Sequence, residues 1–246
     1  MDIKDALGIG PIAEAAKRVT DGAVDAASAF LSRICLPAAE EFGLLLRDKV
    51  REWRASNAVK IATKADAKLR RLPGWEGRHA HPRLVGQILE HGSWSEADEV
   101  QEMWGGLLAA SCTEDGKDDS NLMFVDFLSR LSLSQVCILD YACKSAEVQV
   151  TLAGWLTANF LTVDLPKLRA LTGTDDTQRL DRELDHLRAL GLLSEQHGGF
   201  AMLSTNAGLT PTPLALQMYA RCNGHRGSPP EFYRKLGTLR SAEGAV

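Results

Sequence analysis

A long amphipathic segment is the clearest pattern of apolar and polar positions in the chain. Between Pro37 and Leu72, apolar residues recur at intervals of three and four, which places them on one stripe of a helix. Proline suits the first turn of a helix, and Pro73-Gly74 ends the pattern. Unbroken, such a helix would be roughly 50 Å long. The pattern predicts a long helix over 37–72 that forms the spine of a bundle or an oligomer contact.

Shorter amphipathic segments follow, and they predict helices over 82–92, 93–110, 122–131 and 132–147. Ser93–Glu96 and Ser132–Gln135 both have the capping-box pattern that begins a helix. Val148–Val163 is apolar but interrupted by polar residues and a glycine, so we expect a buried core helix there. No uncharged apolar run reaches the length of about 18 residues that a membrane-spanning helix needs. These helices would form an α-helical domain over residues 1–150.

The last third of the chain has a different pattern. Two helices are expected over 165–171 and 176–190, and a β-hairpin in which Leu192–Ser194 and Phe200–Leu203 flank Gly198-Gly199. A final helix follows Pro213. The order helix, helix, hairpin, helix is typical of a winged helix. We therefore predict a mainly α fold: a helical bundle followed by a winged-helix-like module with a small β-hairpin over 151–225, then a partly flexible C-terminal extension over 226–246.

Charge is distributed unevenly, although the net charge is only -4. Residues 1–72 hold 13 Lys and Arg against 10 Asp and Glu, a net of +3, whereas residues 93–150 hold 3 against 11, a net of -8. The middle of the chain would repel nucleic acid, and only the flanks could attract it. The apolar fraction of 45% predicts a packed core.

Candidate chemical groups are few. The five cysteines form no CxxC pair, and Cys112 and Cys137 fall on apolar faces, so we expect reduced, structural thiols in a cytoplasmic protein. His79 and His81, with His91 and Glu90, could in principle hold a metal, but His81 precedes Pro82 and is well placed to cap a helix. No phosphate-binding loop, nucleophile elbow or zinc-protease motif occurs. We expect no catalytic residue, no cofactor and no metal.

DNA binding by the winged-helix-like module is disfavoured by its charge. The stretch that would read DNA, Asp175–Leu190, carries Arg179, Arg182 and Arg188 but also five acidic residues, and the predicted hairpin has no Lys or Arg. Few counterions would be released on binding. A module of this kind more often packs against protein.

Three segments carry a resemblance to a known family: Glu96–Ser111, Phe124–Ser132 with Ile138-Leu139, and Thr212-Pro213-Leu214. They resemble the Abi-alpha (abortive infection) family of phage-resistance proteins, over about residues 8–222 and most specifically over 94–140. Gly105-Gly106 departs from the alanine-rich version of the family pattern. The resemblance implies antiviral defence and brings no catalytic residue with it.

Three functions compete. The first is a non-enzymatic defence protein that self-associates or binds a protein partner from a defence operon, with Phe30, Phe42, Leu46, Val50 and Trp53 as the contact residues. The second is a transcriptional regulator that contacts DNA through Arg179, Arg182 and Arg188. The third is a membrane-active toxin whose amphipathic N-terminus, residues 1–36, inserts into lipid after assembly.

Overall fold

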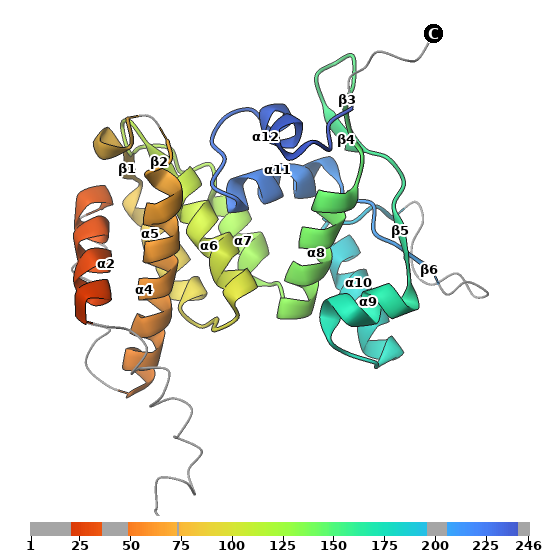
Figure 1. Ribbon diagram of the computed structural model, residues 1–246, viewed down its shortest axis with the longest axis horizontal. Coiled ribbons are helices and arrows are strands. Elements are labelled where there is room, and N and C mark those ends of the chain that lie inside the picture. Colours follow the sequence, from red (N-terminus) through yellow and green to blue (C-terminus); the bar gives the residue numbers. More distant parts are fainter. Residues whose placement is uncertain (1–20, 36–48, 73, 196–205, 241–246) are drawn as a thin grey trace, which may run out of the picture. The chain divides into compact units, whose positions relative to one another are not determined.

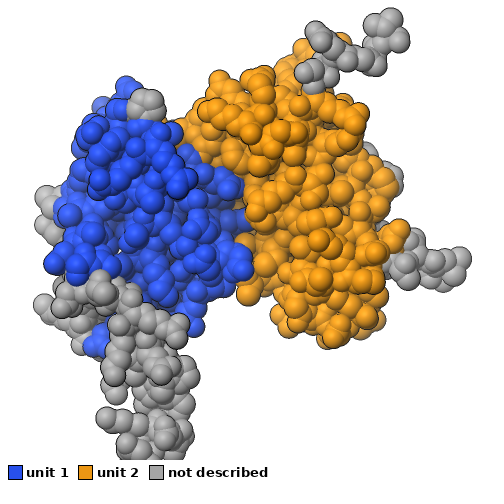
Figure 2. Space-filling view, in the orientation of Figure 1, with its two compact units in different colours: residues 1–129, 222–224 blue, residues 130–221, 225–246 orange. Residues whose placement is uncertain are grey.

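The computed structural model describes residues 21–35, 49–72, 74–195 and 206–240, and most of these residues are helical (Figure 1). Strands in this part of the chain form only short antiparallel pairs. The predicted mainly α fold is therefore confirmed. The chain divides into two compact units, coloured separately in Figure 2. Unit 1 holds residues 1–129 and 222–224, and unit 2 holds residues 130–221 and 225–246.

Unit 1 is a helical bundle built around two helices that cross closely. Its elements are α2 (Asp21–Ile34), α4 (Lys49–Leu69), η2 (Trp75–Gly77), β1 (His79–Ala80), α5 (Pro82–Gly92), α6 (Asp98–Ala110), β2 (Cys112–Thr113) and α7 (Leu122–Ser129). α4 makes its largest contact with α6 and also packs on α2. The buried stripe of α4 is rich in alanine, with Ala58, Ala62 and Ala65 fully covered. Small side chains on this stripe let the two helix backbones approach each other.

Gly105 of α6 lies where the two helices pack closely against each other. A Cβ atom added to Gly105 would lie 2.7 Å from the Cβ of Lys64 and 3.1 Å from the carbonyl oxygen of Ile61, both on α4. Glycine is thus required at this position by the packing of α6 on α4, not by a turn. The departure of Gly105 from the alanine-rich family pattern has a physical reason in this close contact.

Two predictions on unit 1 are partly or fully met. α5 spans the expected residues, and His81 caps it, because its Nδ1 accepts a hydrogen bond from the Arg83 N–H at 3.2 Å. The long helix predicted over 37–72 is present as α4 from Lys49 to Leu69. The first part of that prediction, residues 37–48, lies outside the described residues.

The capping box predicted at Ser93–Glu96 is wrong. α6 begins at Asp98, and its N-cap Ala97 offers no side-chain hydrogen bond. Ser93 instead follows the end of α5, where its hydroxyl donates to the Glu90 carbonyl at 3.1 Å and accepts from Arg54 Nε at 3.0 Å. Glu96 accepts a hydrogen bond from the Trp53 indole N–H. Side chains of α4, which are distant in sequence, bond to the Ser93 hydroxyl and the Glu96 carboxylate, so these groups do not form a local cap.

Unit 2 combines helices with two short sheets. Its elements are α8 (Leu133–Ser145), β3 (Val148–Val150), β4 (Leu156–Ala158), β5 (Thr162–Asp164), α9 (Leu165–Thr172), α10 (Thr177–Ala189), β6 (Asn206–Gly208), α11 (Pro213–Cys222) and α12 (Pro229–Leu236). β3 pairs with β4, and β5 pairs with β6. The capping box predicted at Ser132–Gln135 is confirmed, because Ser132 Oγ accepts from the Gln135 N–H and Gln135 Oε1 accepts from the Ser132 N–H.

The winged-helix-like arrangement stays a prediction. α9 and α10 occur where two helices were expected, and α11 begins at Pro213. In the predicted hairpin, however, the strand Phe200–Leu203 lies outside the described residues. The described partner of Leu193 is Pro211, through an isolated antiparallel bridge.

The core helix predicted over Val148–Val163 is wrong. This segment forms β3 and β4 as a hairpin and then continues into β5. Val148 and Leu156 are buried, whereas residues 151–155 between the strands are exposed. β-Branched residues and a turn glycine favour strands over a helix here, and the apolar content that suggested burial belongs in part to an exposed surface.

Candidate interaction surface

The turn between β3 and β4 is held in one conformation by three hydrogen bonds. The Gly154 N–H donates to the Thr151 carbonyl at 2.9 Å, and the Thr151 N–H donates to the Trp155 carbonyl at 2.9 Å. The Thr151 hydroxyl accepts from the Trp155 N–H at 3.1 Å. Gly154 has a φ of 85°, in the left-handed region. This is the geometry of a three-residue hairpin loop that ends in glycine, and it presents the turn side chains rigidly.

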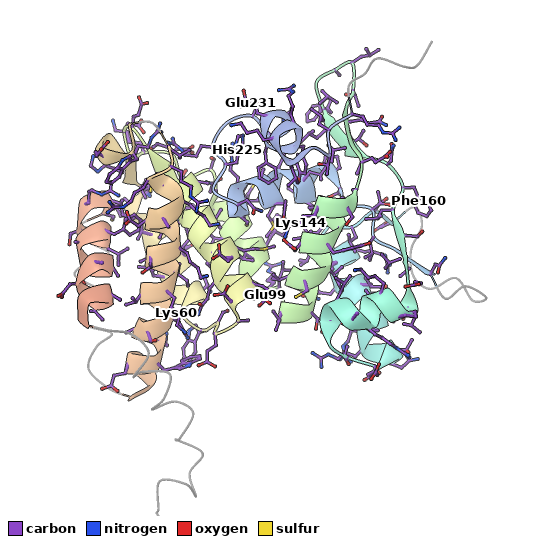
Figure 3. All side chains as sticks on the ribbon, viewed as in Figure 1. Lys60, Glu99, Lys144, Phe160, His225 and Glu231 are labelled. Atoms are coloured by element: carbon purple, nitrogen blue, oxygen red, sulfur yellow. The ribbon has the colours of Figure 1, made fainter. Side chains whose placement is uncertain are left out.

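Three large apolar side chains are exposed on this hairpin and just after it. Leu152 at the turn is fully exposed, and Trp155 is 67% exposed. Phe160 after β4, labelled in Figure 3, is 56% exposed. Together they leave roughly 400 Å² of apolar surface in water. Single exposed apolar residues are common on proteins, but several on one short segment point to an interaction site.

The whole segment 148–163, which we call the hairpin ribbon, contains no charged residue. Charges stand at its two ends. Glu147 accepts from Arg240 Nη2 at 2.6 Å and from the Asn159 amide at 3.0 Å. At the other end, Asp164 caps α9 by accepting from the Lys167 N–H at 2.9 Å. These charges anchor the hairpin ribbon to unit 2 and leave its exposed part uncharged.

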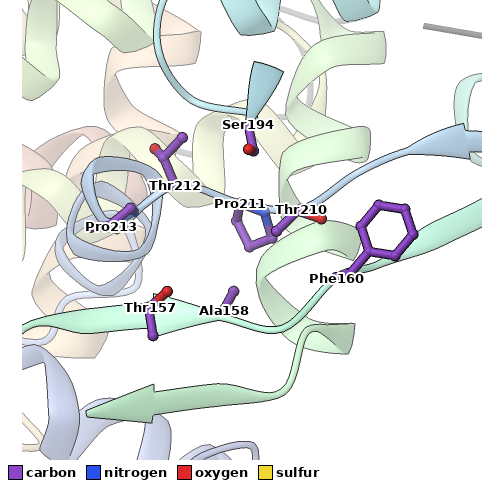
Figure 4. A pocket seen from close by; sticks show the side chains of 8 residues that line it. All are labelled: Thr157, Ala158, Phe160, Ser194, Thr210, Pro211, Thr212 and Pro213. Atoms are coloured by element: carbon purple, nitrogen blue, oxygen red, sulfur yellow. The ribbon is translucent and has the colours of Figure 1, made fainter. Parts of the chain in front are cut away.

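A small pocket of about 200 Å³ lies beside β4 (Figure 4). Thr157, Ala158 and Phe160 form one wall, and Ser194 with the segment Thr210–Pro213 forms the other. None of the lining residues is charged. Thr210 and Thr212 are held in place, since Thr210 Oγ1 accepts from the Leu161 N–H and Thr212 Oγ1 donates to the Gly191 carbonyl. The pocket offers hydroxyls and proline rings, and it contains no acid, base or thiol.

The interaction residues predicted from the sequence lie in unit 1. Phe30 on α2 is buried within that unit, at 4% exposed. Trp53 on α4 is half-buried, and its ring centroid lies 6.1 Å from that of the exposed Trp94. Phe42 and Leu46 fall outside the described residues, and so does the side chain of Val50. Sequence reasoning missed the hairpin ribbon, although the lack of charge between Glu147 and Asp164 could have drawn attention to it.

The three arginines proposed as DNA contacts lie on α10 but differ in exposure. Arg179 is exposed and lies 3.7 Å from Glu183. Arg182 is exposed as well. Arg188 is only 8% exposed and donates to Asp185 at 2.9 Å. A buried, paired guanidinium cannot easily reach a phosphate, which leaves two arginines on this helix to make such contacts.

The histidines considered as metal ligands do not converge. His81 caps α5, and His79 Nδ1 lies 3.2 Å from the Arg33 carbonyl. Within the described residues, no group of three or more His, Cys, Asp or Glu side chains is arranged to hold a metal ion. In unit 2, His225 Nε2 lies 3.0 Å from the Ser228 carbonyl and 3.9 Å from Glu231, and burial lowers the pKa of His225 (Figure 3).

The cysteine thiols considered as nucleophiles differ in burial. Cys112 is fully buried, and this burial raises the pKa of its thiol to about 12. Cys137 is half-buried. A thiol with so high a pKa carries almost no thiolate at neutral pH, so Cys112 is suited to packing and not to nucleophilic attack.

Ion pairs in unit 1 tie α4 to the helices packed on it. The hydrogen bond from Arg54 lowers the pKa of Glu90 at the end of α5. Burial raises the pKa of Glu102 on α6, but hydrogen bonds from Lys64 and Lys68 outweigh it and bring that pKa below its ordinary value. These groups serve the packing of helices within unit 1.

Comparison with known proteins identifies a family. The model of a family described as abortive infection alpha matches residues 54–203, which is more than half of the chain. Neither a search of curated proteins nor a search of solved structures found a match. No helix in the described ranges is long and apolar enough to cross a lipid bilayer.

Proposed function

The chain belongs to the abortive infection alpha family, and from this premise we propose that it acts in bacterial antiphage defence by contacting another macromolecule through the hairpin ribbon, without catalysing a reaction. The observation that carries the proposal is the exposure of Leu152, Trp155 and Phe160 on an uncharged segment. The fold of the chain leaves Leu152 and most of Trp155 in water. A partner that covers these side chains would remove their apolar surface from water, which favours binding.

A rigid presentation of Leu152 and Trp155 supports a binding role. The hydrogen-bonded turn fixes the backbone beneath both residues, so less conformational freedom is lost when a partner binds. Tryptophan is also among the residue types that contribute most to binding energy at protein interfaces. A protein partner fits the ribbon better than DNA does, because phosphates need cations and the ribbon has none.

Self-association through the long α4 segment remains a second proposal. Trp53, Arg54 and Trp94 form an aromatic and cationic cluster in unit 1, with Arg54 stacked 4.4 Å from the ring of the half-exposed Trp94. Tryptophan and arginine are enriched at interface hot spots. Light scattering over a range of protein concentrations tests this proposal, and an unchanged monomer mass at the highest concentration counts against it.

The test of the main proposal is a plaque assay in a bacterial host that gains phage protection from the wild-type gene. The double variant Leu152→Ser and Trp155→Ser removes most of the exposed apolar surface at the turn. We expect it to lose protection while its thermal unfolding stays close to wild type, because exposed side chains contribute little to stability. Met123→Ser is the matched control, since Met123 is an exposed apolar residue on α7, at 47%.

Two results would contradict the proposal. One is full protection by the double variant. The other is an equal loss of protection by Met123→Ser, which would show that any loss of exposed apolar surface has this effect. The Arg179→Ala and Arg182→Ala pair tests the regulator alternative in the same host. Loss of protection in that pair alone, together with salt-sensitive DNA binding by the wild type, would favour DNA contact.

A further inference from the structure

We propose that unit 1 carries a second interaction surface, which binds a basic segment of a partner protein. This surface, which we call the tryptophan patch, consists of Trp53, Trp94, Glu90 and Glu96. Lys or Arg side chains of the segment lie along the Trp94 indole and place their charged ends at the two carboxylates. The inference goes beyond the proposed function, because it concerns a surface other than the hairpin ribbon and a partner of defined charge.

Trp94 is a large aromatic side chain that the fold leaves largely in water. It lies in the turn between α5 and α6 and is 54% exposed. Its ring centroid is 6.1 Å from that of Trp53 on α4, at an interplanar angle of 58°. The two side chains therefore form one aromatic surface. Tryptophan is favoured at interaction sites because it offers a large contact area and has little conformational freedom to lose.

The turn that carries Trp94 is fixed on both sides of this residue. Before it, the Asn57 side-chain amide donates to the Ser93 carbonyl at 3.0 Å. After it, the Gln101 side-chain amide donates to the Ser95 carbonyl at 2.8 Å. Asn57 and Gln101 are both buried and are hydrogen-bonded to each other. Buried hydrogen-bond networks rigidify a structure, so the backbone at Trp94 loses little freedom when a partner binds.

Arg54 shows within the molecule how this surface holds a cation. Its guanidinium carbon lies 4.4 Å from the centroid of the Trp94 ring, and its Nη2 donates to Glu90 at 2.7 Å. An indole face and a carboxylate thus bind one guanidinium together. A partner's Lys or Arg meets the same two kinds of group at the exposed part of Trp94 and at Glu96, an exposed residue that accepts from the Trp53 indole. The apolar stem of Lys or Arg packs well on an indole.

The charge exposed around the tryptophan patch is negative, although its ion pairs are formally neutral. Residues 84–110 carry five acidic side chains and no Lys or Arg. The Arg54 side chain is 12% exposed, against 60% for its partner Glu90. Lys64 is likewise 19% exposed, against 77% for its partner Asp98. Because the carboxylates are more exposed than their cations, this face attracts a basic segment and repels nucleic acid.

A second copy of this chain is a poorer occupant of the tryptophan patch. Two copies related by a twofold axis would bring the same surface of each molecule together. Glu90 and Glu96 would then face the carboxylates of the other copy, and like charges across an interface disfavour binding. The exposed part of Trp94, roughly 130 Å², also suits a short segment better than an interface of about 800 Å² on each partner.

The first experiment identifies the chemistry that Trp94 recognises. A yeast-displayed library of random decapeptides is selected for binding to the full-length wild-type protein and then depleted of peptides that also bind Trp94→Ser. Peptides that bind the hairpin ribbon are removed in the second step, because the ribbon of Trp94→Ser is unaltered. We expect the remaining peptides to carry a net positive charge. Circular dichroism and thermal unfolding check that Trp94→Ser is folded.

The second experiment tests the carboxylates with the best synthetic peptide, whose binding is followed by fluorescence anisotropy. Glu90→Gln together with Glu96→Gln removes two negative charges and keeps oxygens that accept the same hydrogen bonds. The matched control, Glu114→Gln with Asp119→Asn, removes two negative charges from exposed residues between β2 and α7. We expect the first pair to weaken binding about tenfold or more and the control pair to have little effect.

Salt dependence distinguishes a charged contact from a purely apolar one. Raising the salt concentration from about 0.1 M to about 1 M screens exposed charges. Peptide binding by wild type and by the control pair should therefore weaken strongly over this range. Binding by the Glu90 and Glu96 pair should change much less.

Four results would overturn a basic occupant. No peptide survives the depletion step, the surviving peptides are uncharged or acidic, or the Glu90 and Glu96 pair binds no more weakly than its control. The fourth is a dimer mass in light scattering that Trp94→Ser abolishes, which would assign the tryptophan patch to a second copy. The plaque assay on Leu152→Ser and Trp155→Ser decides the proposed function separately, since none of these peptide measurements depends on the hairpin ribbon.

Discussion

Replacing Gly105 by alanine sets two opposing effects against each other at the crossing of α4 and α6. Alanine stabilises a helix interior by about 1 kcal/mol relative to glycine. The added Cβ, however, would lie 2.7 Å from the Cβ of Lys64 and 3.1 Å from the carbonyl oxygen of Ile61. Carbon atoms pack best at about 3.5–4.0 Å, so the helices would have to separate by roughly 0.8 Å. Neither Lys64 Cβ nor the Ile61 backbone can rotate away.

The packing effect should prevail. Overfilling a packed core costs about 1–3 kcal/mol. Separating the two helices by roughly 0.8 Å would also remove a quarter or more of the van der Waals attraction between each pair of atoms that moves apart along the α4–α6 interface. We expect Gly105→Ala to lower the free energy of unfolding by about 1–2 kcal/mol in total, which corresponds to a fall in Tm of about 2–8 °C.

The assay is thermal unfolding followed by helical circular dichroism, with Gly86→Ala as the matched control. Gly86 lies within α5, and a Cβ added there meets no atom within 4 Å. Its substitution should give only the helix-propensity gain and raise Tm. If Gly105→Ala is as stable as wild type or shifts Tm in the same direction as Gly86→Ala, the close approach of α4 and α6 is refuted.

Three further predictions follow from local chemistry. Gly154→Ala should destabilise unit 2 by about 1–2 kcal/mol, measured by thermal unfolding, because a residue with a side chain is strained at this φ of 85°. Cys112 and Cys222, whose burial raises each pKa to about 12, should react with a thiol reagent at pH 8 only after unfolding in guanidinium, as peptide mapping by mass spectrometry can show. The depressed carboxyl pKa values of Glu90 and Glu102 contribute stability that is present above their ordinary pKa and is lost as pH falls through the folded values. A Glu90→Gln and Glu102→Gln variant should therefore show a smaller fall in Tm than wild type between about pH 5 and pH 3.

Sequence reasoning succeeded where the signal is local. Helical spacing and the Ser132–Gln135 cap depend on residues within one or two turns, and the structure has both. The same capping pattern at Ser93 failed because Arg54 and Asn57, distant in sequence, bond to that residue. Such long-range competition leaves no trace in a short motif.

The candidate site was harder to foresee than the fold. The apolar content of the hairpin ribbon suggested burial, because a sequence does not distinguish an apolar residue that is buried in the core from one that is exposed on the surface. Leu152 and Trp155 are recognisable only once the Thr151–Trp155 turn places them in water. The sequence likewise does not show which arginines of α10 are exposed. The structure shows that Arg188 is buried, whereas Arg179 and Arg182 are exposed.

The exposed apolar residues of the hairpin ribbon also have a consequence for the protein at high concentration. Charged side chains normally keep identical molecules apart, and Leu152 and Trp155 are exposed on a segment that carries no charge. We expect molecules whose hairpin ribbon is uncovered to associate through it as their concentration rises, so that overexpression lowers solubility.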